Sequence, residues 1–181
     1  IQEMVFVELS DNEEFEEAEQ VFREAIKSGK NLGLLSEAGC PGVADPGAAI
    51  VALAHREGIK VVPLVGPSSL LLALMASGMN GQRFSFHGYL PPKRPELAKE
   101  LRRLENLSRQ QDQTQIFIET PYRNDQLLET LLKTCKPTTR ICVAAELTGP
   151  NEYVKTKTVA DWKKEKTGFH KKPVIFLLHA G

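Results

Sequence analysis

The chain has 181 residues, a formal net charge of zero and 41% hydrophobic residues, the proportions of an ordinary globular protein. Its length allows one large domain or two small ones. No run approaches the roughly 20 apolar residues of a membrane-spanning helix, and the neutral charge excludes a strongly basic nucleic-acid binder while allowing a local basic patch.

The first half of the chain is predicted to alternate strands with helices. Ser10 and Glu13 form a candidate capping box, hydrophobic residues at helical spacing follow it, and Gly29 suits the end of that helix. Asp45-Pro46 and Gly66-Pro67 place a proline in the first turn of two further helices. The apolar runs predict strands at 4–9, 32–35 and 59–64.

The second half repeats the pattern after a linker at about 78–83. Helices are expected from about 95 to 107 and from Thr120 onward. Strands are expected at 84–87, 115–118, 140–145, 153–157 and 173–178. The alternation indicates an α/β fold with a mostly parallel sheet in each half, and the linker divides the chain into domains 1–79 and 83–181.

Three junctions share one construction, in which an apolar strand leads through a turn of small residues to a helix opened by proline. They are 35–47, 64–69 and 118–123. Ligands of open α/β sheets bind beyond the carboxyl ends of the strands, where helix N-termini offer free N–H groups. The three junctions together predict a binding cleft.

Several other chemistries lack their motifs. The chain has no GxxxxGK[ST], no GxGxxG after a strand and no GxSxG. Cys40, Cys135 and Cys142 form neither a CxxC pair nor a disulfide framework, which favours a reduced, cytoplasmic setting. The four histidines are scattered, so no metal site is predicted.

The residues at these junctions carry a family resemblance. Ser36-Glu-Ala-Gly-Cys-Pro-Gly-Val-Ala-Asp-Pro-Gly47 resembles the S-D-A-G-x-P-x-x-x-D-P-G loop of the tetrapyrrole (corrin/porphyrin) methylase superfamily. The match is closest to the branch that 2′-O-methylates a cytidine ribose of small-subunit ribosomal RNA. Four more motifs of that branch follow in order, in the segments 61–69, 86–91, 118–123 and 145–148. The resemblance covers nearly the whole chain.

The resemblance implies a two-domain α/β methyltransferase, usually a homodimer, that holds S-adenosyl-L-methionine in the cleft between its domains. By position in the motifs, the implied cofactor-binding residues are Ala38, Gly39, Asp45, Pro46, Ser68, Ser69, Thr120 and Ala145. The chain departs from the family at Glu37, where an aspartate is usual, and at Tyr122, where a histidine is usual. The family's opening strand and its glycine- and proline-containing loop have no counterpart here and are expected before Met4.

The candidate catalytic residues are Glu119, Glu146 and Arg123. A ribose hydroxyl is a poor nucleophile, so a general base is expected, and both glutamates follow strands at the predicted cleft. Alternatively, the glutamates hold backbone or cofactor groups. Arg123 either orients a phosphate or pairs with one of the glutamates.

Two clusters of basic residues are candidates for RNA contact, and solvated helix faces are the alternative. Their members are Lys93, Arg94, Lys99, Arg102, Arg103 and Arg109, and Lys163, Lys164, Lys166, Lys171 and Lys172. Three functions therefore stay open: methylation of ribosomal RNA, methylation of a tetrapyrrole or another small molecule, and cofactor binding without activity. A basic rim would favour RNA, and a wide apolar cleft would favour a tetrapyrrole.

Overall fold

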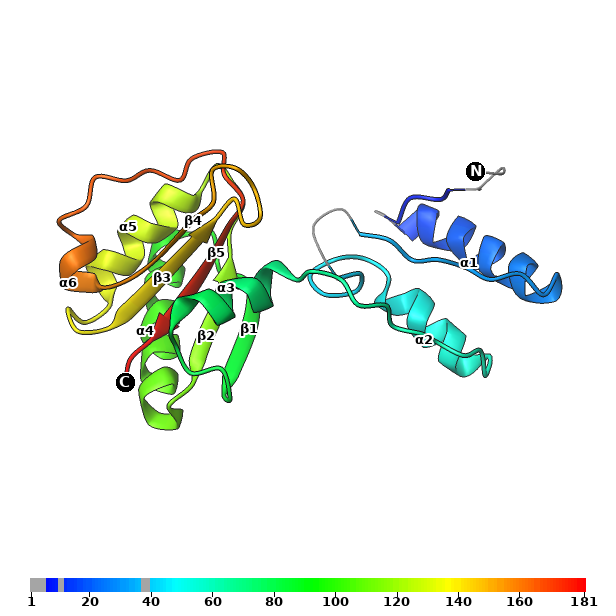
Figure 1. Cartoon of the computed structure of the whole chain (residues 1–181), viewed down its shortest axis with the longest axis horizontal. Helices are drawn as coiled ribbons and strands as arrows, with labels where there is room; N and C mark the ends of the chain where they lie inside the picture. The colour runs from blue at the N-terminus through cyan, green and yellow to red at the C-terminus, as the bar shows by residue number, and fades with distance from the viewer. Residues whose placement is uncertain (1–5, 10–11, 37–39) are drawn as a thin grey trace. The chain divides into compact units, whose positions relative to one another are not determined.

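The computed structural model describes residues 6–9, 12–36 and 40–181, and the chain divides into two compact units, Ile1–Ser68 and Ser69–Gly181 (Figure 1). The domain ranges expected from the sequence place the division at 79–83 instead. Helix α3 (Ser69–Ser77) accounts for the difference, because its Ala73 and Leu74 pack with residues of the sheet in the second unit.

In the first unit, helices α1 (Asn12–Lys27) and α2 (Ala48–Arg56) pack together through Phe22 and Leu53. None of its described residues forms a strand, so the strands expected at 32–35 and 59–64 are not observed, and neither is any part of 4–9 that the structure describes. Apolar runs indicate a tendency to be buried, but a strand also needs a neighbour that pairs with its backbone. Leu35 and Leu64 in these runs are exposed.

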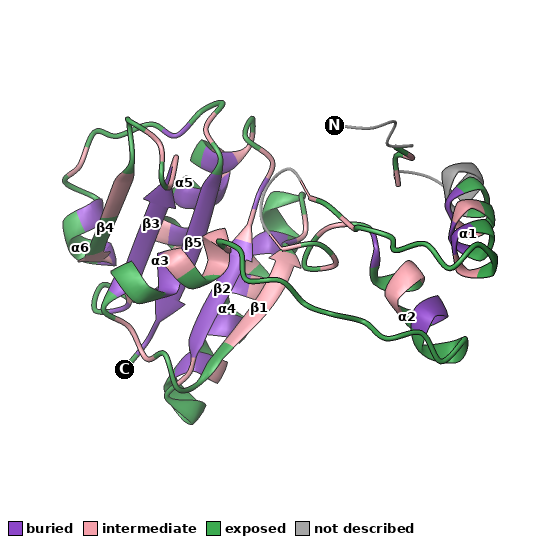
Figure 2. Cartoon of the chain, turned by 45° about the vertical axis from the view of Figure 1, so that its right-hand side comes forward, coloured by how far each residue is buried: buried purple, intermediate pink, exposed green. Residues whose placement is uncertain are grey.

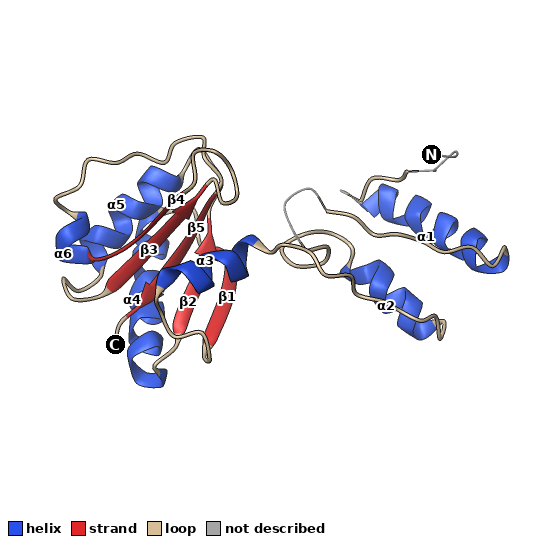
Figure 3. Cartoon of the chain, viewed as in Figure 1, coloured by secondary structure: helices blue, strands red, loops and turns tan. Residues whose placement is uncertain are grey.

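The second unit contains a five-stranded sheet whose strands lie in the order β1-β2-β5-β3-β4 (Figure 3). The strands are β1 (Phe84–Tyr89), β2 (Thr114–Ile118), β3 (Arg140–Ala145), β4 (Tyr153–Thr158) and β5 (Val174–His179). All five match expected strands within two residues at each end. The α/β class is therefore confirmed for this unit.

The expectation of a mostly parallel sheet is wrong for this unit, since only β1 and β2 pair in parallel. Strand β5 is antiparallel to both β2 and β3, and β3 is antiparallel to β4. The loop at 146–152 is too short for the crossover that parallel pairing of β3 and β4 would require. Strand β5 lies between β2 and β3, which run in the same direction.

Helices cover both faces of the sheet, and the middle strands are buried (Figure 2). Helices α4 (Arg94–Gln111), α5 (Asn124–Thr134) and α6 (Val159–Trp162) pack against one face, and α3 packs against the other. Successive strand residues therefore enter different cores: Phe117 packs with α4 and α5, whereas Ile116 packs with α3.

Trp162 in α6 anchors the larger core. Its side chain is almost fully buried, and its Nε1 donates a hydrogen bond of 2.8 Å to the carbonyl oxygen of Ile141 in β3. The polar indole group is thus satisfied inside the core. None of the helices in the described part of the chain combines the length and the apolar character that a membrane crossing requires.

Candidate active site

Two candidate catalytic glutamates follow strands that end at the same edge of the second unit's sheet. Strands β1, β2 and β3 run in the same direction, so their carboxyl ends meet at this edge. Glu119 follows β2, and Glu146 follows β3. This edge of the sheet is where an α/β fold binds ligands.

Glu119 is held in place by two hydrogen bonds. Its side chain is only 3% exposed, and its Oε1 accepts from the backbone N–H of Thr120 at 2.6 Å and from Nη2 of Arg123 at 2.7 Å. The alternative in which Arg123 pairs with a glutamate is therefore the arrangement observed. Arg123 Nε is also buried, and it has no partner among the described residues. The guanidinium, whose side chain is 39% exposed, thus keeps N–H donors that a ligand could use.

Glu146 lies in a strained turn. Its φ is 50° and that of Thr148 is 65°, values that residues other than glycine seldom adopt. The turn is held by hydrogen bonds from Glu146 N to the carbonyl oxygen of Pro173 and from Thr148 N to Oε2 of Glu152. Strain that the surroundings enforce in this way is concentrated at functional sites.

The side chain of Glu146 remains accessible. It is 27% exposed, and its Oε2 accepts from Nζ of Lys172 at 2.7 Å. Lys172 was assigned in the sequence only to a basic cluster, and nothing in the motifs predicts this ion pair. The two glutamates thus differ in exposure: the side chain of Glu119 is enclosed, whereas that of Glu146 reaches the surface.

The segment 169–173 joins the two glutamate turns. Lys171 N donates to the carbonyl oxygen of Pro121 at 2.9 Å, and Asn124 Nδ2 donates to the carbonyl oxygen of Lys172 at 2.8 Å. The same segment supplies the Pro173 carbonyl that binds Glu146. The turns after β2 and β3 are therefore connected through one short stretch of backbone.

Tyr122 marks the position where the family usually has a histidine. Its side chain is exposed and makes an edge contact with His170, with ring centroids 5.9 Å apart. The segment 169–173 thus brings a histidine beside the position that lacks one. The sequence motifs do not reveal this, because the two residues are 48 positions apart.

The expected cofactor-binding residues are distributed over both units. Thr120 and Ala145 lie at the edge described above, Ala145 being fully buried, and Ser69 begins α3. Asp45, Pro46 and Ser68 belong to the first unit. Ala38 and Gly39 lie outside the described residues.

The position of Asp45 before Pro46 suggests that it caps helix α2, but the structure shows a different role. Its Oδ2 instead accepts a hydrogen bond of 2.8 Å from Oγ of Ser36, while Gly47 occupies the N-cap position with a φ of 123°. The bond joins the two ends of the loop that carries the first family motif. A positive φ of this size favours glycine.

The two cysteines of the second unit, Cys135 and Cys142, lie away from the edge described above. Cys135 and Cys142 are buried, and burial raises the pKa of the Cys135 thiol to about 12, so this thiol stays protonated at neutral pH. Cys40 belongs to the first unit. No group of three or more potential metal ligands occurs among the described residues.

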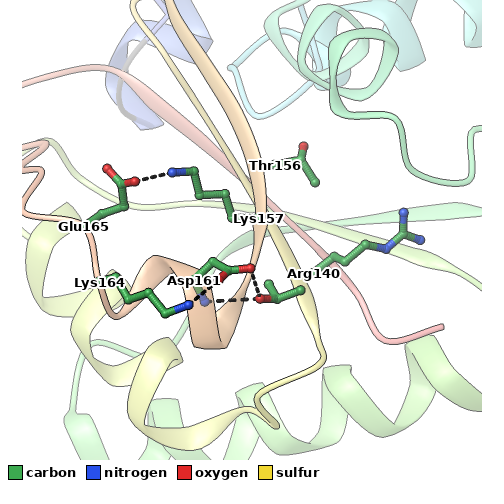
Figure 4. Close-up of a pocket in the computed structure, with 7 residues that line it drawn as sticks. Arg140, Thr156, Lys157, Asp161, Lys164 and Glu165 are labelled. Atoms are coloured by element: carbon green, nitrogen blue, oxygen red, sulfur yellow. Dashed lines mark hydrogen bonds and ion pairs between the residues drawn. The ribbon is translucent and has the colours of Figure 1, made fainter.

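A separate pocket of about 470 Å³ lies at the opposite edge of the sheet, where β3 begins and β4 ends (Figure 4). It is lined by Arg140, Thr156, Lys157, Thr158, Asp161, Lys164 and Glu165. Lys157 pairs with Glu165, and Lys164 pairs with Asp161 at 2.8 Å. The charges of these four side chains compensate one another, and the pocket lies at the end of the sheet away from Glu119 and Glu146.

Removing the Arg123 side chain is expected to destabilise the second unit. In Arg123→Ala, the Glu119 carboxylate stays buried with only the Thr120 N–H as a partner, which should lower the free energy of unfolding by about 1–3 kcal/mol. Urea unfolding measures the change. Adding Glu119→Gln should recover part of the loss. Arg103→Ala, which breaks the exposed pair with Glu100, should cost no more than about 1 kcal/mol. Equal losses in the two single variants would contradict this interpretation.

Fold and site together define an α/β protein with its candidate catalytic carboxylates at the carboxyl edge of a mixed sheet. The structure is similar to a crystal structure of diphthine synthase, with a TM-score of 0.65 and 17% identity over 94% of this chain and 68% of the other. Residues 5–162 match the tetrapyrrole (corrin/porphyrin) methylases, and the chain belongs to this family.

Two relatives carry the same name, ribosomal RNA small subunit methyltransferase I. The protein of Vibrio cholerae is 34% identical over 94% of this chain and 59% of its own length. The protein of Xylella fastidiosa is 41% identical over 79% of this chain and 50% of its own length. The chain thus spans between half and three fifths of these relatives. The recognition of the family from its motifs is confirmed.

Proposed function

We propose that the protein is an S-adenosyl-L-methionine-dependent methyltransferase that 2′-O-methylates a ribose of small-subunit ribosomal RNA. The observation that carries the proposal is the 34% identity, over 94% of this chain, with a relative named as a ribosomal RNA small subunit methyltransferase. A ribosomal RNA substrate implies action in the cytoplasm. A homodimer is part of the proposal, by analogy with the family.

The proposed cofactor-binding residues are the ones that the family motifs identify. Thr120 and Ala145 in the second unit would contribute to binding, together with Asp45 and Ser68 in the first. The edge of the sheet suits such a ligand, because Arg123, held there by Glu119, offers guanidinium N–H groups for a carboxylate. Bound there, S-adenosyl-L-methionine would supply an activated methyl group.

The residues of the edge would then have different roles. Glu146, which reaches the surface, would accept the proton of the ribose hydroxyl, a contribution of roughly 10²–10⁴ in rate. Arg123 would bind a phosphate or carboxylate through the N–H groups that do not bond to Glu119. Glu119, enclosed and doubly bonded, would position Arg123. Holding the nucleophile and the methyl group in line supplies the remaining acceleration.

Calorimetric titration with S-adenosylhomocysteine, the demethylated cofactor, tests the proposal. We expect micromolar binding that is lost in an Asp45→Ala, Ser68→Ala double variant whose circular dichroism is unchanged. Asp161→Ala, Ser28→Ala is a matched control at exposed sites and should bind normally. Failure of the protein to bind the ligand would contradict the proposed function. Methyl transfer to a tetrapyrrole but not to RNA would support the proposed cofactor and show that the substrate is a tetrapyrrole.

A further inference from the structure

Helix α4 has two contrasting faces. Leu97, Leu101, Leu104 and Ser108 are buried against the sheet and α5. The opposite face carries four basic residues, Lys99, Arg102, Arg103 and Arg109, all of them exposed. Arg102 is three residues from Lys99 and seven from Arg109, which places these three along one side of the helix, and Arg103 lies beside them, four residues from Lys99. We call these four residues the α4 basic stripe.

Most of the positive charge of the stripe is uncompensated. Arg103 is bound by Glu100 at 2.6 Å. Within the part of the chain that the structure describes, Lys99, Arg102 and Arg109 have no ion pair. The only acidic residues of α4 are Glu96, Glu100 and Glu105, of which Glu105 is buried and hydrogen-bonded to Lys136 N. The stripe therefore presents three unpaired cations in a protein of zero net charge.

The second basic cluster of the sequence is different. Lys164 pairs with Asp161, and Lys172 pairs with Glu146 at the candidate active site. Its members all lie in the segment between α6 and β5, so no helical spacing aligns them. Of the two clusters, only the one on α4 places several unpaired cations on one rigid surface.

The stripe has the dimensions of a nucleic-acid contact. Lys99 and Arg109 are ten residues apart, or about 15 Å along the helix axis. A stacked strand that rises about 3.4 Å per nucleotide places about four phosphates along this length. The helix begins after β1, near the edge that carries Glu119 and Glu146, and ends before β2 at the other edge.

We propose that the α4 basic stripe binds the phosphate backbone of the RNA substrate, outside the nucleotide that is methylated. The proposal rests on the proposed function. The stripe would hold the RNA backbone in position, and it would not distinguish one base sequence from another. Neutralised phosphates release counterions, so the strength of the contact depends on salt.

The test compares RNA binding by the protein and by a Lys99→Gln, Arg102→Gln, Arg109→Gln variant between 50 and 200 mM salt. The probe is an in vitro transcript of small-subunit ribosomal RNA. Log K falls as log salt rises, and each lost phosphate contact reduces the steepness of this fall by about 0.7–0.9, so we expect the magnitude of the slope to decrease by about 2–3. A polyuridine probe should show the same fall, because the contact is independent of sequence.

A Lys27→Gln, Lys30→Gln, Lys60→Gln variant is the matched control, since it removes the same charge from exposed positions of the first unit. Its slope should change by less than about 1. Equal changes in the two variants, an unchanged slope in the stripe variant, or no RNA binding by the protein at 50 mM salt would each overturn the proposal. Titration of the stripe variant with S-adenosylhomocysteine distinguishes failure of the stripe proposal from failure of the proposed function. The variant should still bind this ligand as the unchanged protein does.

Discussion

A Glu146→Gln variant is expected to methylate ribosomal RNA about 10²–10⁴-fold more slowly than the unchanged protein. The amide keeps the size of the side chain and a hydrogen-bond acceptor, but it cannot take the proton of the ribose hydroxyl at neutral pH. Glu146 is suited to this role because its carboxylate is partly exposed and lies in a strained turn that hydrogen bonds hold in place. Transfer of a labelled methyl group from S-adenosyl-L-methionine to an RNA transcript measures the effect.

Glu165→Gln provides a closely matched control. Glu165 also pairs with a lysine, and its side chain is 30% exposed compared with 27% for Glu146, but it lies in the pocket at the other edge of the sheet. Its replacement should leave the rate within about twofold, since it removes no group that the proposed reaction uses. A Glu146→Gln variant with normal kcat would exclude Glu146 as the general base. A rise in KM alone would assign it to binding.

Trp162→Ala is expected to lower the free energy of unfolding of the second unit by about 3–5 kcal/mol. The change empties a fully buried site in the larger core and removes the donor bound to the Ile141 carbonyl. Helix α6 has only four residues, so few other contacts can compensate. The loss is a large fraction of the 5–15 kcal/mol that stabilises a typical domain.

Urea unfolding followed by far-ultraviolet circular dichroism measures this loss, because Trp162 is the only tryptophan and its removal eliminates the fluorescence signal. Trp162→Phe should cost less, since the ring still fills most of the space and only the Nε1 hydrogen bond is lost. A loss below about 1 kcal/mol in Trp162→Ala would show that the core repacks around the cavity.

The elements of the second half could be predicted from the sequence because each apolar run is bounded by turn residues. Strand β3, for example, occupies 140–145 as expected. The position of β5 between β2 and β3 could not be predicted, since pairing depends on contacts between residues far apart in the chain. The runs at 32–35 and 59–64 show the same limit, because local composition does not supply a neighbouring strand.

The candidate site was predictable to a similar extent. Glu119, Arg123 and Glu146 belong to family motifs, and the pairing of Arg123 with one of the glutamates was one of the two roles expected for it. Lys172 and His170 were not assigned to the site, because they reach the edge only through the fold. The assignment of catalytic and cofactor-binding roles stays a prediction.

The backbone link between the two glutamate turns has a thermodynamic consequence. The segment 169–173 bonds to Pro121 on one side and to Glu146 on the other, and Asn124 holds it through the carbonyl of Lys172. Because both turns bond to this short segment, we expect the opening of either one to loosen the segment that holds the other, so that the two share one local opening equilibrium. A ligand that orders either turn therefore reduces the entropy cost of ordering the other, which couples binding at Arg123 to the placement of Glu146 without any change of fold.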